Sequence, residues 1–212
     1  MKIHTVSEFV SVVDDDLQWR KRELSALHFQ LERGRNHEID MLRRAAVCLL
    51  YAHWQGFITQ AAISFLNFVS RQNIDLGNLR AGIICVAIKG RFTVAEDAKK
   101  YTQRIDLIEL LRSPMPDKLQ PADEGIMPET SNLDSAQFQE YARILGIDYS
   151  PYETKRNLLD ERLVRNRHAI AHGDRIPIDQ EMYEDVRSLV LELLELFRND
   201  IQNAAHNKAY LK

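Results

Sequence analysis

Apolar residues recur at spacings of three and four along most of the chain, the pattern of helices with one buried face. The segment from Ser7 to Arg33 carries such a stripe and ends before Gly34, which predicts the first helix; its apolar members are Val13, Leu17, Leu24, Leu27 and Leu31. The segment from His37 to Gln72 carries two stripes, one of Leu42, Ala46, Leu49, His53 and Phe57 and one of Val47, Tyr51, Trp54 and Ile58. A helix that is apolar on two faces belongs at the centre of a bundle.

The second half of the chain continues the helical pattern. Two shorter helices are predicted at Leu79–Lys89 and Val94–Leu111, separated near Gly90, and another at Asp134–Leu145. Asp179 is a candidate N-cap for the last helix, whose apolar residues are Tyr183, Val186, Val190, Leu193, Phe197 and Ile201. No stretch alternates apolar and polar residues as a strand does. The predicted fold is therefore an all-α bundle of about five to seven helices.

One long polar stretch interrupts the helical pattern. Residues from about 113 to 132 begin with Ser113-Pro114-Met115-Pro116 and carry no helical repeat. A loop of this length is uncommon inside a compact domain, so we expect a mobile flap or an insertion there. The chain otherwise reads as a single domain over residues 1–212, with a loose tail from about 205 to 212.

Composition agrees with one soluble helical domain. The chain has 212 residues, of which 45% are hydrophobic, and only 8 glycines and 6 prolines, which favours one sizeable core of long helices. The net charge of −3 provides no overall attraction to nucleic acid. Contact with nucleic acid would therefore require a local basic patch, for which the candidates are Lys155, Arg156, Arg162, Arg165, Arg167 and Arg175.

Neither the cysteines nor the first residues point to export. Cys48 and Cys85 are too far apart in sequence for a zinc knuckle and too few for a disulfide scaffold, so we expect buried thiols in a reducing compartment. The chain start leads into Asp14-Asp15-Asp16 rather than an apolar run, and no apolar run reaches membrane-spanning length. We therefore expect a cytoplasmic protein with no membrane partner.

One predicted helix carries the densest cluster of candidate catalytic side chains. Its start is indicated by Ser150-Pro151-Tyr152-Glu153, a Ser-x-x-Glu capping pattern with proline at the first helical position. Its end is indicated by Gly173, which can adopt the left-handed conformation, and by Pro177 beyond it. The helix is thus predicted over about 151–172, a length of ~33 Å at ~1.5 Å per residue. The cluster occupies its last turns and consists of Arg162, Arg165, Asn166, Arg167, His168 and His172.

These residue types form a minimal set for cleaving RNA. His172 lies near the negative end of the helix dipole, which favours the protonated imidazole, and an imidazole exchanges protons near neutral pH. The neighbouring arginines keep their charge and donate in a fork that matches phosphate oxygens. Because the ribose 2′-hydroxyl supplies the nucleophile, neither a metal ion nor another cofactor is required.

The same residues carry a resemblance to a known family. The segment from Arg167 to Gly173, Arg-His-Ala-Ile-Ala-His-Gly, resembles the Arg-polar-x-x-x-His signature of the HEPN superfamily. The segment from Tyr51 to Phe57, Tyr-Ala-His-Trp-Gln-Gly-Phe, is similar to a Tyr-x-x-Trp-x-Gly-Phe helix of some stand-alone bacterial HEPN proteins. The resemblance implies a helical bundle and, as in many members, a metal-independent endoribonuclease of toxin–antitoxin or antiviral defence systems. It also implies a homodimer in which two motifs meet in a cleft.

The resemblance implies Arg167, His168 and His172 as catalytic residues, while Arg165, Asn166, Arg162 and His53 are candidate supporting residues. His168 stands where the family usually has asparagine, and Asp174 stands where some toxins carry a tyrosine that a partner enzyme modifies with a nucleotide. That form of control is therefore not expected here.

The choice between two arginines stays open. At ~100° per residue, Arg165 lies nearly in line with His172, whereas Arg167 is rotated by ~140° from it. Helix geometry thus favours Arg165, and the motif alignment favours Arg167.

Other interpretations of the histidines have less support. His168 and His172 have the spacing of two metal ligands, but Ala169 replaces the glutamate that zinc proteases require. None of the histidines has the Glu-x-x-His pattern of a di-iron bundle. His53, on an apolar stripe, is either a hydrogen-bonded core residue, which is the more frequent case, or a residue of the catalytic cleft.

Two functional hypotheses remain beside the structural alternative of a solvated helix end. The first is a dimeric, metal-independent endoribonuclease, a toxin or phage-defence effector, with RNA as substrate and a protein antitoxin or regulator as a candidate partner. The second is a non-catalytic HEPN-like module that binds a protein partner or a nucleotide. The presence of both Arg167 and His172 favours the first, because a pure binder has less need of a titratable histidine.

Overall fold

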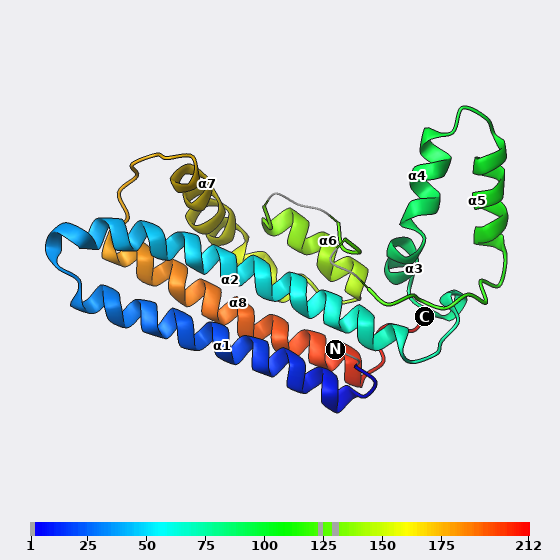
Figure 1. Ribbon diagram of the computed structural model, residues 1–212, viewed down its shortest axis with the longest axis horizontal. Coiled ribbons are helices and arrows are strands. Elements are labelled where there is room, and N and C mark those ends of the chain that lie inside the picture. Colours follow the sequence, from blue (N-terminus) through cyan, green and yellow to red (C-terminus); the bar gives the residue numbers. More distant parts are fainter. Residues whose placement is uncertain (1–2, 123–124, 129–131) are drawn as a thin grey trace.

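A computed structural model describes residues 3–122, 125–128 and 132–212. Three long helices lie side by side and form the body of the molecule (Figure 1): α1 (Val6–Arg33), α2 (Asn36–Ser70) and α8 (Gln180–His206). α2 contacts both α1 and α8, as its two apolar faces predict. The all-α prediction is confirmed, since the described residues hold helices and isolated bridges but no strand. Among them, no helix has the length and apolar character needed to cross a membrane.

Local signals set the ends of these helices. The Thr5 hydroxyl accepts a hydrogen bond from the backbone N–H of Glu8, and the Glu8 carboxylate accepts one from the N–H of Thr5, so a capping box begins α1. Asp179 accepts from the N–H of Met182 and caps α8, as predicted. Burial of one α8 stripe joins it to the core; the stripe contains Tyr183, Val186, Leu189, Val190, Leu193, Leu194, Phe197 and Ile201.

A second layer lies across one face of the bundle (Figure 1) and consists of α6 (Ser135–Leu145) and the helical segment that leads to the motif. Phe138 of α6 connects the layers, because its ring centroid lies 4.9 Å from that of Trp54 in α2 and 5.6 Å from that of Phe197 in α8. It also lies 4.8 Å from the ring centroid of Tyr152, which begins the motif segment. One aromatic cluster therefore fixes α6 and the motif segment on the bundle.

An arm rises from one end of the bundle, built from α3 (Ala81–Ala87), α4 (Lys89–Asp97) and α5 (Thr102–Arg112) (Figure 1). The predicted single helix over 94–111 is wrong, because the chain turns at residues 98–101 and α5 packs back along α4. That turn contains neither glycine nor proline, so the sequence gives no local sign of it. Gly90, expected to separate two helices, lies instead in the first turn of α4.

The described part of the long loop is joined to the body by hydrogen bonds. The carbonyl oxygens of Asp117 and Met115 accept from the N–H groups of Leu76 and Gly77, which form a 3₁₀ turn with Asn78. Asn67 of α2 bonds both the N–H and the carbonyl oxygen of Ala122. Residues 123–124 and 129–131 of the predicted flap lie outside the described residues.

The C-terminal tail is also held, contrary to the expectation of a loose end. Tyr210 is buried, and its ring packs against Phe65 and Phe68 of α2. The carbonyl oxygen of Tyr210 accepts from the N–H of Arg80, and Lys212 donates to the carbonyl oxygen of Asn78. The tail therefore joins the end of α8 to the base of the arm.

Candidate functional site at the end of the motif helix

The motif lies at the end of a continuous helical path that combines three kinds of turn: a 3₁₀ stretch Ser150–Lys155, a π-helical stretch Leu158–Val164, and α7 (Arg165–Ala171). Its residue range matches the predicted helix over 151–172, but the capping contacts predicted at its start do not form. The Asp148 carboxylate accepts from both the N–H and the hydroxyl of Ser150, at 3.0 and 2.7 Å. Ser150 is thereby occupied, so the predicted capping box with Glu153 is absent from this described segment.

The π-helical stretch connects the motif to α6. Its backbone bonds reach five residues back, as from the N–H of Arg165 to the carbonyl oxygen of Asp160. The wider turn places the adjacent residues Leu163 and Val164 both in the core. On its other side, the Asp160 carboxylate accepts from the N–H and hydroxyl of Ser135, at 2.8 and 2.6 Å. Turns of this rare type are frequent at functional sites.

Backbone bonds at its C-terminus fix where α7 ends. Gly173 has a φ of 92°, in the left-handed region, as its position in the sequence predicts. Its N–H donates to the carbonyl oxygen of Ile170, and the N–H of Asp174 donates to that of Ala169, the pair of bonds that defines a Schellman motif. His172 is the C-cap residue just before this turn, so its position is set by backbone geometry.

The two candidate arginines have different surroundings. Arg167 is half-buried: its Nη1 donates to Asn132 Oδ1 at 2.7 Å, and its guanidinium carbon lies 4.4 Å from the centroid of the Tyr51 ring on α2. Arg165 points to solvent, with 76% of its side chain exposed, and pairs with Glu161 one turn back at 2.8 Å. Arg167 is therefore the arginine held against the bundle, whereas Arg165 is partly neutralised at the surface.

Two residues of α2 hold the segment that carries Asn132. The Tyr51 hydroxyl accepts from the N–H of Leu133 at 2.7 Å, and Trp54 Nε1 donates to the carbonyl oxygen of Leu133 at 2.9 Å. Tyr51 and Trp54 lie three residues apart and thus on one face of α2. The N–H and the carbonyl oxygen of Leu133 therefore both have hydrogen-bond partners on α2. Because Asn132 directly precedes Leu133, these bonds hold it beside Arg167.

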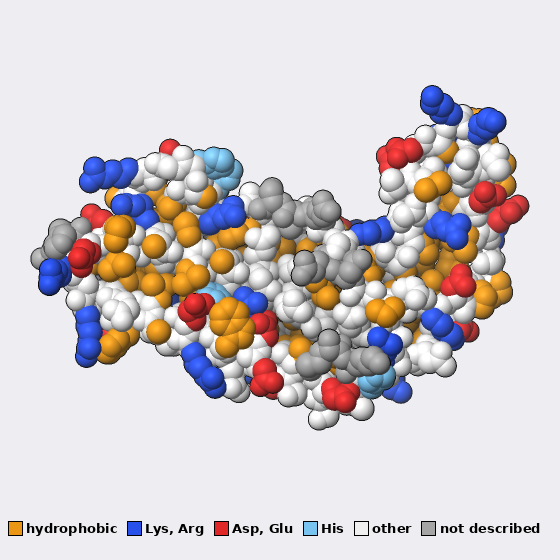
Figure 2. Space-filling view, viewed as in Figure 1, with side chains coloured by type: hydrophobic (Ala, Val, Ile, Leu, Met, Phe, Trp, Pro, Cys, Tyr) orange, Lys and Arg blue, Asp and Glu red, His pale blue; other side chains and the backbone are white. Residues whose placement is uncertain are grey.

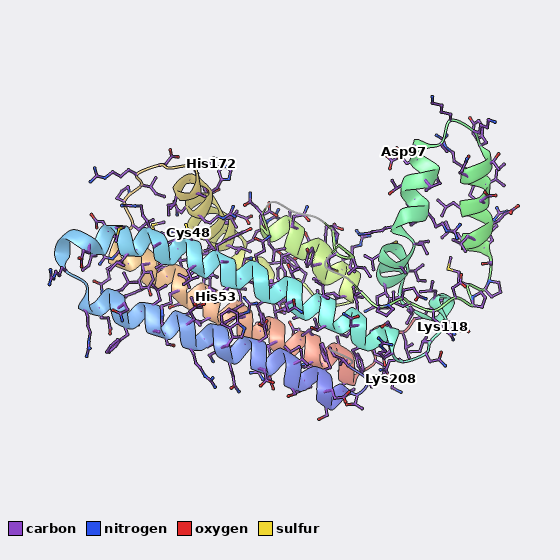
Figure 3. The ribbon with its side chains drawn as sticks, in the orientation of Figure 1. Cys48, His53, Asp97, Lys118, His172 and Lys208 are labelled. Carbon is purple, nitrogen blue, oxygen red and sulfur yellow. The ribbon has the colours of Figure 1, made fainter. Side chains whose placement is uncertain are left out.

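The two motif histidines form an exposed pair at the outer end of α7. Their ring centroids lie 4.3 Å apart with the planes tilted by 56°. Both side chains are exposed, and Figure 3 shows His172 at the end of α7 that is turned away from the bundle. The imidazoles can therefore meet a large ligand without movement of the fold.

The comparison with known families agrees with this arrangement. The family model described as HEPN_MAE_28990-like HEPN matches residues 9–210, which is nearly the whole chain. The chain belongs to the HEPN family. No curated protein and no solved structure matches it. Membership supports the all-α fold and a role of the ribonuclease or nucleotide-related kind, since the HEPN superfamily includes ribonucleases.

Within the described residues, half of the six cations predicted to form a basic patch around the HEPN motif are paired with acids, namely Lys155, Arg162 and Arg165. Lys155 contacts Glu192 at 2.6 Å, and Arg162 contacts Asp185 at 3.5 Å, so both join the motif segment to α8. Figure 2 shows basic side chains around α7 interspersed with acidic ones. Asn166 donates to the carbonyl oxygen of Arg162 at 2.8 Å and so bonds to its own helix. Arg162, Arg165 and Asn166 are thus placed beside the site rather than with Arg167.

His53 lies away from the HEPN motif. Two residues along α2 correspond to ~200° of rotation, so His53 faces the side opposite Tyr51. His53 is only 2% exposed. Its Nε2 lies 2.8 Å from the carboxylate of Glu23 on α1, but the geometry is not that of a hydrogen bond. Its ring lies beside that of Trp19. Burial lowers the pKa of His53, although the Glu23 carboxylate works in the opposite direction. His53 is therefore a buried residue that faces Glu23 and Trp19 rather than the motif, although its Nε2 lacks the hydrogen bond expected of a core histidine among the described residues.

Several residues that build the site were missed by sequence reasoning. Cys48 of α2 lies beneath α7 (Figure 3); burial raises the pKa of its thiol, while the charge of Arg167 acts the other way. Tyr51 and Trp54 were found as members of an apolar stripe and of the Tyr-x-x-Trp-x-Gly-Phe resemblance, but neither was assigned a role at the site. Asn132 lies in the segment expected to be a flap and carried no signal of its own. Contacts across the fold, rather than spacing, identify these residues.

Proposed function

We propose that the protein is an endoribonuclease that cleaves RNA by attack of the ribose 2′-hydroxyl. The observation that carries the proposal is the position of Arg167. Contacts with Asn132 and Tyr51 fix its guanidinium, and Arg167 lies on the same short helix as the exposed histidine pair. A permanent cation that is held in place and a proton-transfer group next to it are what this reaction needs.

Each side chain has a defined role in the proposed reaction. One imidazole removes the proton from the 2′-hydroxyl, whose oxygen attacks the adjacent phosphorus. The bond from phosphorus to the 5′-oxygen breaks, and a second imidazole gives that oxygen a proton. Arg167 has five N–H donors, of which Asn132 takes one, so others can bind the phosphate oxygens as negative charge develops. The products carry a 2′,3′-cyclic phosphate and a 5′-hydroxyl.

We further propose that two copies act together as a symmetric homodimer. The histidines are exposed on the isolated chain, and acid–base catalysis works best where water is excluded. A two-fold arrangement that brings two α7 ends together would cover both pairs and supply further imidazoles. Light scattering of the purified protein across a concentration series tests this proposal, because a monomer with full activity contradicts it. A toxin or phage-defence role, with an antitoxin or regulator as partner, rests on the resemblance alone.

A binding module without catalysis is the second candidate. It is favoured by the same contacts that hold Arg167, since an arginine engaged with Asn132 and Tyr51 also suits recognition of a phosphate without cleavage.

Cleavage assays separate the two candidates. Purified protein is incubated with total RNA in EDTA, and the ends of the products are identified by enzymatic end-labelling. Cleavage to cyclic phosphate ends that persists in EDTA, and is lost in His172→Ala, supports the nuclease. Activity that needs an added divalent ion contradicts the proposed chemistry. Binding of RNA without any cleavage leaves the binding module as the function.

A further inference from the structure

A second site-like feature lies between the arm and α6, away from the HEPN motif. A pocket of about 970 Å³ opens there, and Figure 2 shows the surface hollowed between the arm and the rest of the molecule. Its walls come mainly from α3, α6 and the residues after α6, with Ile126 and Pro128 of the loop also at its edge, and Val86, Ile144 and Ile147 are among the apolar residues that line it. Pockets of this size with an apolar lining and a few polar groups are typical of ligand sites.

The two walls are held at a fixed distance. Gly82 of α3 packs directly on α6, since a Cβ there would lie 2.6 Å from the carbonyl oxygen of Ile144. At the end of α6, Arg80 donates through Nη1 to the carbonyl oxygen of Gly146 at 3.1 Å and covers that glycine. The pocket is therefore formed before any ligand arrives, which lowers the entropic cost of binding.

Cations outnumber acids around the pocket. Arg80, Lys89 and Arg143 line it, against Glu140 and Asp148. Lys89 donates to the carbonyl oxygen of Gly125, whereas Arg143 is exposed and forms no ion pair with any residue that the structure describes. Asp148 is engaged with Ser150. An anionic group is thus favoured at the rim, beside an apolar interior.

The pocket lies at the opposite end of α6 from the motif segment. The first residue of α6, Ser135, bonds Asp160 of the π-helical stretch, and the pocket is lined by Glu140 at the middle of α6 and by Arg143 and Ile144 near its other end. The 11 residues of α6 span ~16 Å at ~1.5 Å per residue. A nucleic-acid strand carries one phosphate per ~3.4 Å in stacked form, so roughly five nucleotides cover the length of α6, and further nucleotides are needed to reach the histidines, which lie beyond Asp160 on the motif helix.

We propose that the pocket between α3 and α6 binds an unpaired nucleotide of the same RNA strand, more than five nucleotides from the cleaved bond. Arg143 and Arg80 bind the flanking phosphate, and the base packs on Val86 and Ile147 with Glu140 as an acceptor at its edge. The inference rests on the proposed function, because it assigns a second contact to the same substrate. It makes single-stranded RNA, rather than a duplex, the preferred substrate.

The native cysteines provide the test. Cys85 is exposed and lines the pocket, whereas Cys48 lies next to Arg167 under the motif helix. Alkylation of Cys85 by iodoacetamide is followed by mass spectrometry, with and without a 12-nucleotide 2′-O-methyl oligoribonucleotide, which lacks the nucleophilic hydroxyl and is not cleaved. We expect the oligonucleotide to slow alkylation of Cys85 at least about fivefold when it is near saturation. An oligomer of the same length without bases should not protect, because base contacts supply much of single-strand binding.

Two charge-reversal variants extend the test, one in the pocket and one as a matched control on α1. Arg143→Glu should weaken oligonucleotide binding about tenfold and remove the protection of Cys85, whereas Arg22→Glu, an exposed position on α1, should change neither. Circular dichroism verifies that both variants are folded.

Different outcomes overturn different claims. Cleavage of unmodified RNA by the wild type, with alkylation of Cys85 unaffected by the oligonucleotide, overturns the pocket assignment and leaves the nuclease in place. Protection of Cys85 without cleavage of unmodified RNA supports the pocket and contradicts the nuclease. Equal protection by the oligomer without bases overturns the assignment to a base.

Discussion

Replacing Tyr51 by phenylalanine isolates one oxygen that positions the proposed catalytic arginine. Tyr51→Phe keeps the ring on which Arg167 lies but removes the hydroxyl that accepts from the N–H of Leu133 at 2.7 Å. Tyr51 is 2% exposed and Leu133 is fully buried, so the orphaned N–H has little access to water. A buried donor that loses its acceptor costs about 1–3 kcal/mol in stability. For a chain of this size the melting temperature should fall by roughly 2–12 °C.

The same change should also reduce RNA cleavage, because Asn132 precedes Leu133 and loses part of its support. A displacement of ~1 Å at a positioning contact can lower a rate by up to ~10²-fold, so we expect a loss of roughly tenfold in kcat with the ring contact intact. Tyr101→Phe is the matched control, since Tyr101 is 75% exposed on the arm. Thermal denaturation and single-turnover cleavage measure the two effects. An unchanged melting temperature would refute the claim that Tyr51 anchors this segment, and normal cleavage in a destabilised variant would refute its link to Arg167.

Four further changes test the site and the fold. His172→Ala should lower cleavage by ~10²–10⁴-fold in an RNA assay while circular dichroism stays unchanged, because the exposed ring contributes little to the core. Arg167→Ala should reduce cleavage far more than Arg165→Ala, whose solvent-exposed pair contributes at most ~1 kcal/mol; equal losses would contradict this ranking. Gly173→Ala should destabilise the protein by roughly 1–2 kcal/mol in urea denaturation, since a φ of 92° strains an alanine. The lowered pKa of His53 means that the unfolded chain binds the proton first, so stability should fall as pH drops below about 6.5, and His53→Gln should flatten that slope in pH-dependent melts.

The long helices could be predicted because their signals are local. Asp179 directly precedes the helix that it caps, and the apolar stripes of α2 and α8 lie within the helices that they specify. The helix predicted over 94–111 was wrong because its turn at residues 98–101 is fixed by packing of α5 on α4 and has no turn residue of its own. The tail was misjudged for the same reason, since the partners of Tyr210 lie in α2 and at Arg80.

The candidate site likewise has a part set by local sequence and a part set by contacts between distant residues. Arg167, His168 and His172 are neighbours in sequence, so a motif could find them as a group. The comparison of helical rotation angles considered only how each arginine is oriented relative to His172. The surroundings of the two arginines differ because Arg167 contacts Tyr51 and Asn132, which lie far from it in the chain. Those contacts depend on the folded bundle, and no spacing within the motif encodes them.

The low burial of the outer two helices of the arm affects both their local stability and the substitutions that they tolerate. Within the described chain, α5 buries none of its residues and α4 buries only Ala95, whereas Ile105 and Ile108 stay about half exposed, at 51% and 50%. Little of the free energy of unfolding therefore resides in these two helices, and they should open and exchange their amide hydrogens well before the bundle does. Substitutions in α4 and α5 are accordingly freer of structural constraint than those on α2. Variation in what the molecule recognises can accumulate there while the motif helix and its support stay the same.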